Sequence, residues 1–350
     1  MSRSQMITAL CTVSESVVVS GLADSQLMFL LFPAPQLLAS FETTTYGTPT
    51  NPVKPLQSYA RRKCAHHPVA ALDSLQDHDT VKVVAAAGNA VSVWDVLRGQ
   101  RLASYSSAGH FYACAYLGPH VVGAAGSGKV LHLFDTRLRP GSRLLWSVEL
   151  AADNLYAIAK VKKSAHARLF EKVFLAGADS AVYAVDLRAG VRDVFDIPQH
   201  MCSSGPDDAT NVTKDEIGPN AILDIAYDAG LLFAIREHGD VCGFSVEQES
   251  VVGRHDLGPF ELSCRISEKI TTRVRCNTDF EDDCVCIAVG GEKNTITVLN
   301  YNADARTLHP PRKFATNFRQ VPVVSWGATG LFFGAGDDVG LIPRYRTQLA

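Results

Sequence analysis

A short pattern recurs along the whole chain and constrains its fold more than any other sequence feature. It consists of a small, β-branched run, a turn rich in Gly, Asn, Asp or Ser, and an alternating apolar run. Seven copies occur, at 17–32, 83–95, 121–135, 173–186, 232–245, 285–300 and 331–344. Each copy is typical of a β-hairpin, because β-branched residues favour strands and turn residues separate the two arms.

Further short apolar segments flank each hairpin. One precedes every copy, and a fourth follows most copies, at 37–42, 101–106, 144–149, 192–197 and 251–257. Four short strands per unit, at intervals of roughly 40 to 60 residues, describe the blades of a β-propeller. No long stretch shows the 3.6-residue period of a helix. The sequence therefore predicts an all-β, seven-bladed β-propeller with four-stranded antiparallel blades.

The chain is predicted to form a single domain, 1–350. The expected blades span about 6–41, 68–107, 108–150, 153–197, 221–257, 262–310 and 320–350, with insertions at 42–67 and 198–220. The last unit supplies three strands at most, so the last blade can be incomplete. Either the chain ends pair as a short clasp, or a weak seam remains that a partner strand would complete, since open strand edges are usually covered.

Composition narrows the class of protein. Of 350 residues, 47% are hydrophobic and 20% charged, which is enough apolar material for a large core. The net charge of -3 gives no global field that would recruit nucleic acid or acidic lipid. No apolar run is long enough for a membrane helix, and Glu15 interrupts the segment where a signal peptide would be apolar. Nine cysteines without framework spacing fit reduced thiols, so we expect a location inside the cell, in cytoplasm or nucleus.

The ends of the third strands carry a family resemblance. Trp94-Asp95 closes one hairpin, Asp135 and Asp186 close the next two, and Gly109-His110 precedes the third blade. These segments resemble the WD-repeat β-propeller family, in a divergent form, over essentially the whole chain. The resemblance implies a buried hydrogen-bond network that stiffens the blades, with the matching positions His110, Asp135, Trp94, Asp95 and Asp186. The other blades lack these residues, so we expect apolar packing between blades to hold them.

Several basic residues are candidates for partner binding. Asp135-x-Arg137 and Asp186-x-Arg188 are similar to the paired box of WD-repeat substrate receptors for cullin-RING ubiquitin ligases, which implies arginines presented to an adaptor. The first insertion ends in a basic cluster, and a second cluster lies at 160–172. We expect partner contacts at Arg61, Arg62, Lys63, Lys160, Lys162 and Lys163. Nucleic acid would bind only indirectly or weakly, because a few phosphate contacts give salt-sensitive binding.

Other motifs do not support an enzyme. The segment Gly123–Val130 fits a phosphate-binding loop by its letters, but a strand follows it and no hydroxyl follows Lys129. Cys284 and Cys286, or Cys64 with His66 and His67, lack the further ligands of a structural zinc site. We therefore predict no cofactor, no metal and no catalytic residue.

Our main hypothesis is a non-catalytic interaction scaffold, a WD-repeat-like subunit of a larger multiprotein complex. Its partners would be other protein subunits, or a peptide or strand docked at the ring seam or the loop rims. One alternative is a ubiquitin-ligase substrate receptor, which requires Arg137 and Arg188 side by side. Another is a propeller enzyme or small-ligand binder, which requires polar groups to converge at the channel mouth, where Asp73 and Asp224 are the chief candidates.

Overall fold

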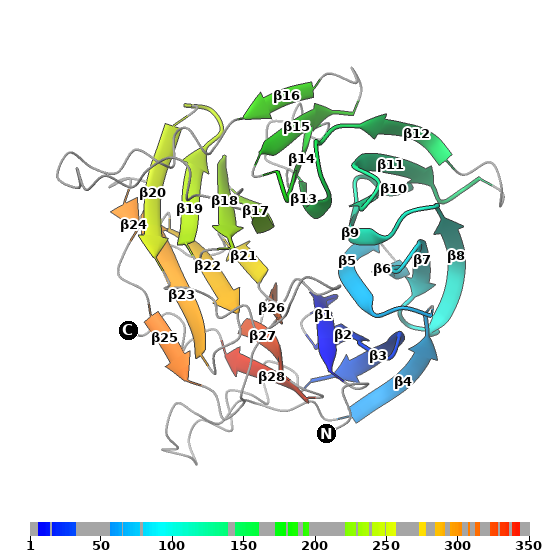
Figure 1. Ribbon diagram of the computed structural model, residues 1–350. Helices are drawn as coiled ribbons and strands as arrows, with labels where there is room; N and C mark the ends of the chain where they lie inside the picture. The colour runs from blue at the N-terminus through cyan, green and yellow to red at the C-terminus, as the bar shows by residue number, and fades with distance from the viewer. Residues whose placement is uncertain are drawn as a thin grey trace, which may run out of the picture.

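Seven antiparallel sheets stand around one axis in the computed structural model (Figure 1). The structure describes residues 6–14, 16–32, 57–64, 66–77, 80–138, 144–160, 172–179, 181–187, 192–195, 221–228, 230–237, 240–248, 250–256, 273–277, 284–290, 295–302, 307–308, 312–315, 323–327, 330–335 and 338–343. All elements in these ranges are strands. The prediction of a seven-bladed, all-β propeller is confirmed.

The first four blades each contain four strands in sequence order. Blade one has β1 (Ile7–Thr12), β2 (Val17–Leu22), β3 (Gln26–Leu31) and β4 (Gln57–Lys63). Blade two has β5 (Val69–Asp77), β6 (Thr80–Ala87), β7 (Ala90–Asp95) and β8 (Gln100–Ser106). Blade three has β9 (Phe111–Tyr116), β10 (Val121–Gly126), β11 (Val130–Asp135) and β12 (Leu144–Glu149). Blade four has β13 (Leu155–Lys160), β14 (Lys172–Gly177), β15 (Val182–Asp186) and β16 (Arg192–Phe195).

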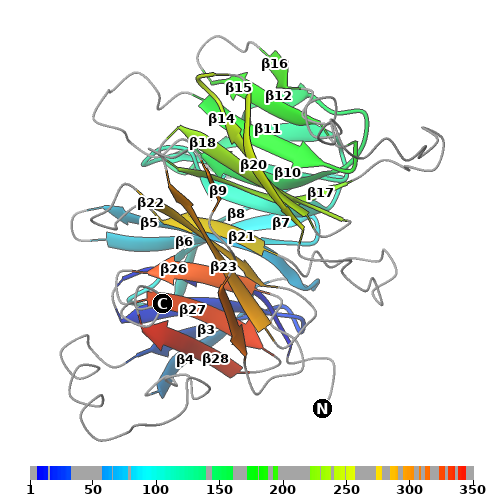
Figure 2. The ribbon, with the colours of Figure 1, turned by 90° about the vertical axis from the view of Figure 1, so that its left-hand side faces the viewer.

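The last three blades are less uniform. Blade five has β17 (Ile222–Asp228), β18 (Leu231–Arg236), β19 (Asp240–Ser245) and β20 (Ser250–Asp256). Blade six has β21 (Arg273–Asn277), β22 (Cys284–Gly290) and β23 (Thr295–Asn302), and two short strands, β24 (Thr307–Leu308) and β25 (Arg312–Ala315), both pair with β23. In the described part of the chain, blade seven has β26 (Val323–Gly327), β27 (Gly330–Ala335) and β28 (Asp338–Pro343). Figure 2 shows blades five, six and seven side by side on the face toward the viewer.

The outer strand of blade one differs from its prediction. The sequence placed that strand at 37–42 and treated 42–67 as an insertion, but β4 occupies Gln57–Lys63 and pairs with β3. Residues 37–42 lie outside the described residues, as does 198–220. An outer strand contributes few buried side chains, so its hydrophobic pattern is weak and its register is hard to read from sequence.

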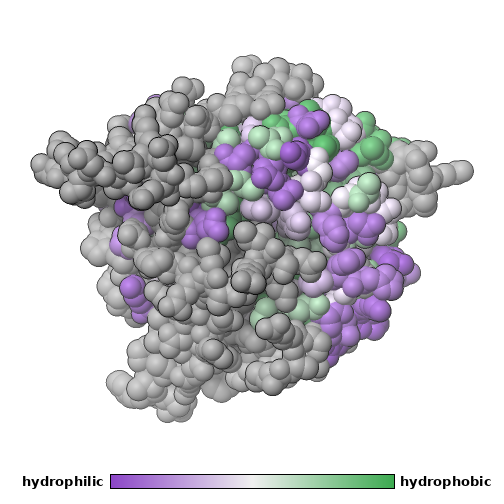
Figure 3. All heavy atoms as spheres, in the orientation of Figure 1, coloured by the Kyte–Doolittle hydropathy of each residue, from purple (hydrophilic) through white to green (hydrophobic). Residues whose placement is uncertain are grey.

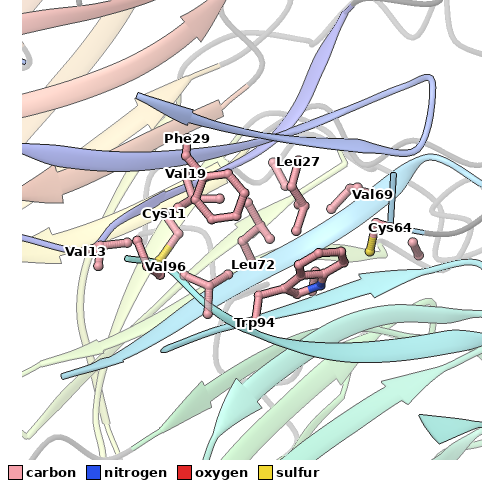
Figure 4. Close-up of a cluster of buried hydrophobic side chains, with 14 residues drawn as sticks. Cys11, Val13, Val19, Leu27, Phe29, Cys64, Val69, Leu72, Trp94 and Val96 are labelled. Atoms are coloured by element: carbon pink, nitrogen blue, oxygen red, sulfur yellow. The ribbon is translucent and has the colours of Figure 1, made fainter. Parts of the chain in front are cut away.

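Apolar packing between neighbouring blades forms the core. Between blades one and two, Phe29, Val69 and Trp94 meet with their neighbours in one cluster of buried side chains (Figure 4). Equivalent clusters lie between the other blades. Third strands such as β15 are buried along most of their length because a neighbouring sheet covers each face. Every blade therefore needs the next one to bury its apolar surface.

Blades one and seven close the ring by side-chain packing. Phe32 and Phe332 make an edge-to-face contact with ring centroids 4.9 Å apart, within a buried cluster drawn from both blades. Thr12 Oγ1 and Ser325 Oγ are 2.8 Å apart, across the inner strands of the same two blades. In the described residues β1 pairs only with β2, and β28 pairs only with β27. No clasp of the two chain ends is found in this part of the chain.

Candidate functional site

Blade two contains a buried polar network around Trp94. The indole Nε1 of Trp94 donates to Ser92 Oγ at 2.8 Å, and Ser92 Oγ lies 3.0 Å from Cys64 Sγ. Burial raises the pKa of the Cys64 thiol, although its hydrogen bond with Ser92 opposes this effect. Trp94 thus takes part in a buried hydrogen-bond network. Its partners are a serine two residues earlier and a cysteine before the first strand of the blade.

Two other positions of the expected network, His110 and Asp135, have contacts outside the Trp94 network. His110 donates its main-chain N–H to Ser127 Oγ at 2.8 Å, and its ring meets the His67 ring edge to face at 5.0 Å. His110 thereby joins the start of blade three to the hairpin turn of the same blade. The recorded contacts of Asp135 are with Arg137 instead of His110.

Two aspartates hold arginines at the turns between third and fourth strands. The Asp135 carboxylate accepts hydrogen bonds from Nε and Nη2 of Arg137, the latter at 2.6 Å. These hydrogen bonds lower the pKa of Asp135 to about 2. In blade two, Asp95 accepts the main-chain N–H of Arg98 at 2.9 Å, and the Arg98 guanidinium lies 3.9 Å from its carboxylate. Arg137 and Arg98 remain 65% and 76% exposed. Each aspartate orients an exposed guanidinium.

The receptor alternative requires Arg137 and Arg188 side by side, and of these two Arg137 lies among the described residues. Asp186 ends β15, and Arg188 lies outside the described residues. The equivalent arginine of blade two, Arg98, follows its aspartate by three positions, whereas Arg137 follows by two. That alternative stays a prediction.

One lysine of the basic cluster predicted at 160–172 lies on a strand instead of a loop. Lys160 is the last residue of β13, in the inner wall of blade four, and its Nζ lies 2.5 Å from Asp73 Oδ2 of blade two. Lys162 and Lys163 lie outside the described residues. A spacing pattern alone could not place Lys160 in the channel, because Asp73 is 87 residues away in sequence.

Asp73 links three blades near the central axis. Besides the Lys160 ammonium of blade four, its carboxylate accepts the main-chain N–H of Tyr116 in blade three at 2.8 Å. Cys114 lies on β9, the same strand as Tyr116. Burial raises the pKa of the Cys114 thiol well above its ordinary value, and the nearby negative charge of Asp73 adds to this effect. Asp73 and Lys160 neutralise each other, so this pair serves to join blades of the ring.

The first basic cluster lies on a strand instead of at the end of a loop. Arg61 pairs with Asp24 at 3.3 Å, and the Nε of Arg62 donates to the Gly99 carbonyl of blade two at 3.1 Å. Lys63 is exposed. Arg62 therefore connects the outer strand of blade one with the turn that carries Arg98.

An exposed apolar surface lies on the outer edge of blades two and three, and the sequence analysis did not single it out. Five leucines there are between 37% and 66% exposed, and they are the only large hydrophobic residues in that state in the described part of the chain: Leu97, Leu102, Leu138, Leu144 and Leu145. Figure 3 shows hydrophobic and hydrophilic residues together toward the right-hand edge, where β8 and β12 lie in Figure 1. The signal was present in β12, whose first residues are apolar at consecutive positions, which an alternating outer strand does not require.

The motifs that suggest cofactors take structural roles. Gly126 ends β10, Lys129 has a φ of 59° in the hairpin turn, and Val130 starts β11. A strand, and no helix N-terminus, follows this glycine-rich segment. No group of side chains suited to a metal ion occurs among the described residues. The described part of the chain also contains no helix with the length and hydropathy needed to cross a bilayer.

The arrangement defines a WD-repeat-like, seven-bladed β-propeller. The chain is similar to the crystal structure of the RRP9 WD40 repeats, at 12% identity and a TM-score of 0.67, covering 97% of this chain and 94% of that one. It is similar to the structure of U3-55K at the same identity and TM-score, covering 97% and 95%. No protein-family model and no curated protein sequence matches it. At this identity, the likeness establishes the fold.

Proposed function

We propose that the protein is a non-catalytic interaction scaffold that holds other protein subunits together in a larger complex. The observation that carries the proposal is the contrast between channel and rim. In the channel, the described ion pair of Asp73 and Lys160 is mutually neutralised, whereas leucines and arginines are exposed together on the outer edge. A stiff ring with an exposed apolar rim is suited to docking other chains.

The location that we propose is inside the cell. Two cysteines, Cys64 and Cys114, are buried and form no disulfide. Free buried thiols suit a reducing compartment.

The seam of the ring offers a second docking position within the same proposal. Among the described residues, blade seven has three strands and its neighbours have four or more, which supports addition of a partner strand at the outer edge of β28. Hydrogen exchange of the β28 amides should slow when the partner is bound. Unchanged exchange in the assembled complex would remove this position from the proposal.

Affinity purification of the full chain, followed by cross-linking and mass spectrometry, tests the scaffold role. We expect one or more subunits to co-purify in fixed stoichiometry through gel filtration. Turnover of a small substrate by the purified chain alone, or a chain that remains a solitary monomer after gentle lysis, would contradict the proposal.

A further inference from the structure

The exposed leucines form two matching groups on neighbouring blades. In blade two, Leu97 lies in the turn after β7, and Leu102 lies on β8. In blade three, Leu138 follows β11, and the pair Leu144–Leu145 begins β12. We call these five leucines, with Arg98, Arg101 and Arg137, the rim surface. Isolated exposed leucines are ordinary, but these are all gathered on two adjacent blades.

A β-bulge places one leucine of each group. In blade two, Val93 pairs with Ala103 and Trp94 pairs with Arg101, so Leu102 is the extra residue. In blade three, Leu133 pairs with Trp146 and Phe134 pairs with Leu144, so Leu145 is the extra residue. Bulges redirect side chains and interrupt the regular edge of a sheet. The two leucines are therefore presented outward at equivalent positions of the repeat.

The two groups are linked by the packing beneath them. Tyr105 of β8 stacks on Phe134 of β11, with ring centroids 4.7 Å apart. Phe134 is in turn the strand partner of Leu144. Blades two and three are thus held in contact under the rim surface, which gives a ligand a fixed spacing between the two groups.

The charged side chains that the rim surface exposes to water are mainly positive. In 95–106, 135–138 and 144–149, the charged residues are Asp95, Arg98, Arg101, Asp135, Arg137 and Glu149. The two aspartates are largely covered, whereas their partners Arg98 and Arg137 are exposed. Asp135 is buried beneath Arg137 and orients its guanidinium. Arg62 adds a further cation at the Gly99 turn. Arginines that are already oriented lose less freedom when a carboxylate binds.

We propose that the rim surface binds an acidic amphipathic helix of a partner protein, with apolar side chains on the leucines and carboxylates beside the arginines. This inference rests on the proposed scaffold function. An added strand is disfavoured because the bulges interrupt the edges of β8 and β12. A second copy of this chain is disfavoured because the exposed arginines of two copies would face each other across the symmetry axis.

Selection from a random 16-residue peptide library on the immobilised full chain tests the chemistry of the ligand. We expect selected peptides to combine leucine or similar residues with Asp and Glu at helical spacing, and to bind more weakly as salt rises. Selected peptides that are neutral or basic, or a chain that forms dimers through this edge in solution, would overturn the inference.

Two variants locate the binding site of the selected peptides. The first double variant, Leu102→Ser with Leu145→Ser, removes apolar contact. The second, Arg98→Gln with Arg101→Gln, removes positive charge and leaves the pair of Arg137 and the buried Asp135 intact. We expect each to weaken peptide binding at least tenfold, measured by fluorescence anisotropy, while the unfolding curve stays unchanged. Lys313→Gln, an exposed lysine on blade six, is the matched control. Equal binding by both double variants and the control would overturn the assignment.

Purification of the assembly separates this inference from the scaffold function. If the wild-type chain recovers its subunits and the Leu102→Ser and Leu145→Ser variant loses one of them, both stand. If the variant retains every subunit, the rim assignment fails and the scaffold function stands. If the wild-type chain recovers no stoichiometric subunit, the scaffold function itself fails.

Discussion

Two strands of the same propeller, β18 and β12, use apolar residues in opposite ways. Every residue of β18 is buried, including Arg236, because the sheets of blades four and six cover its two faces. In β12, no residue is fully buried, although the strand begins Leu-Leu-Trp. Position in the ring thus decides the role of a leucine more than its strand pattern does. The same residue type stabilises the fold between blades and is available for binding at the rim.

The largest effect on the free energy of unfolding is expected at the seam between blades one and seven. Phe332→Ala should reduce the free energy of unfolding by about 3–5 kcal/mol, because it empties a fully buried site against Phe32. Denaturant titration followed by circular dichroism measures the change. Phe332→Leu, which keeps most of the volume, should cost much less. A loss below about 1 kcal/mol in the alanine variant would mean that this seam contributes little to closure.

Alanine substitution should cost very different amounts of stability at two glycines of one hairpin. A Cβ at Gly126 would lie 1.8 Å from the His110 carbonyl oxygen, whereas one at Gly128 would meet nothing within 4 Å. Gly126→Ala should cost about 3 kcal/mol, since backbone must move, and Gly128→Ala should be close to neutral. Thermal unfolding of the two variants gives the comparison, and similar melting temperatures would contradict the close approach of β10 to the start of blade three.

The free energy of unfolding should fall in alkali. Burial raises the pKa values of Cys114, Tyr116 and Cys64 in the folded protein, so the unfolded chain ionises first. The stabilisation is complete below the unfolded pKa of about 8.5 for a thiol, and falls by about 1.4 kcal/mol per pH unit per group above it. Unfolding curves between pH 7 and 10.5 should show this decline, and Cys114→Ala should flatten it. A Cys114→Ala variant with an unchanged slope would remove that thiol from the explanation.

The ion pair of the channel should contribute less. A double-mutant cycle with Asp73→Asn and Lys160→Met should give a coupling of about 1 kcal/mol, since both groups are partly exposed and water screens their attraction. Asp73→Asn should cost more than Lys160→Met alone, because Asp73 also accepts the Tyr116 N–H. Strictly additive single-variant effects would show that the blades are not coupled through this pair.

The smallest effect on stability is expected at the rim. Leu145→Ser should change the free energy of unfolding by no more than about 0.5 kcal/mol, because the side chain is half exposed and lies at a bulge. The same change is expected to weaken partner binding. Substantial destabilisation by Leu145→Ser would show that this leucine stabilises the fold.

Several features could be read from sequence because they depend on residues close together in the chain. The seven hairpins repeat turn residues and period-two strands, and these fix local pairing whatever the neighbours are. The glycine-rich segment before Lys129 was correctly interpreted as a hairpin turn, since a strand pattern follows it. Trp94 donates to Ser92, only two residues earlier, so this contact is local as well.

The sequence by itself determined the seven-fold repeat and the hairpins, because these follow from local pattern. Only the tertiary structure decided that Lys160 pairs with Asp73 across the ring, and that β4 is the outer strand of blade one. It also decided which leucines remain in contact with water. Such contacts join residues distant in sequence, and they depend on how far each strand lies from the axis of the ring.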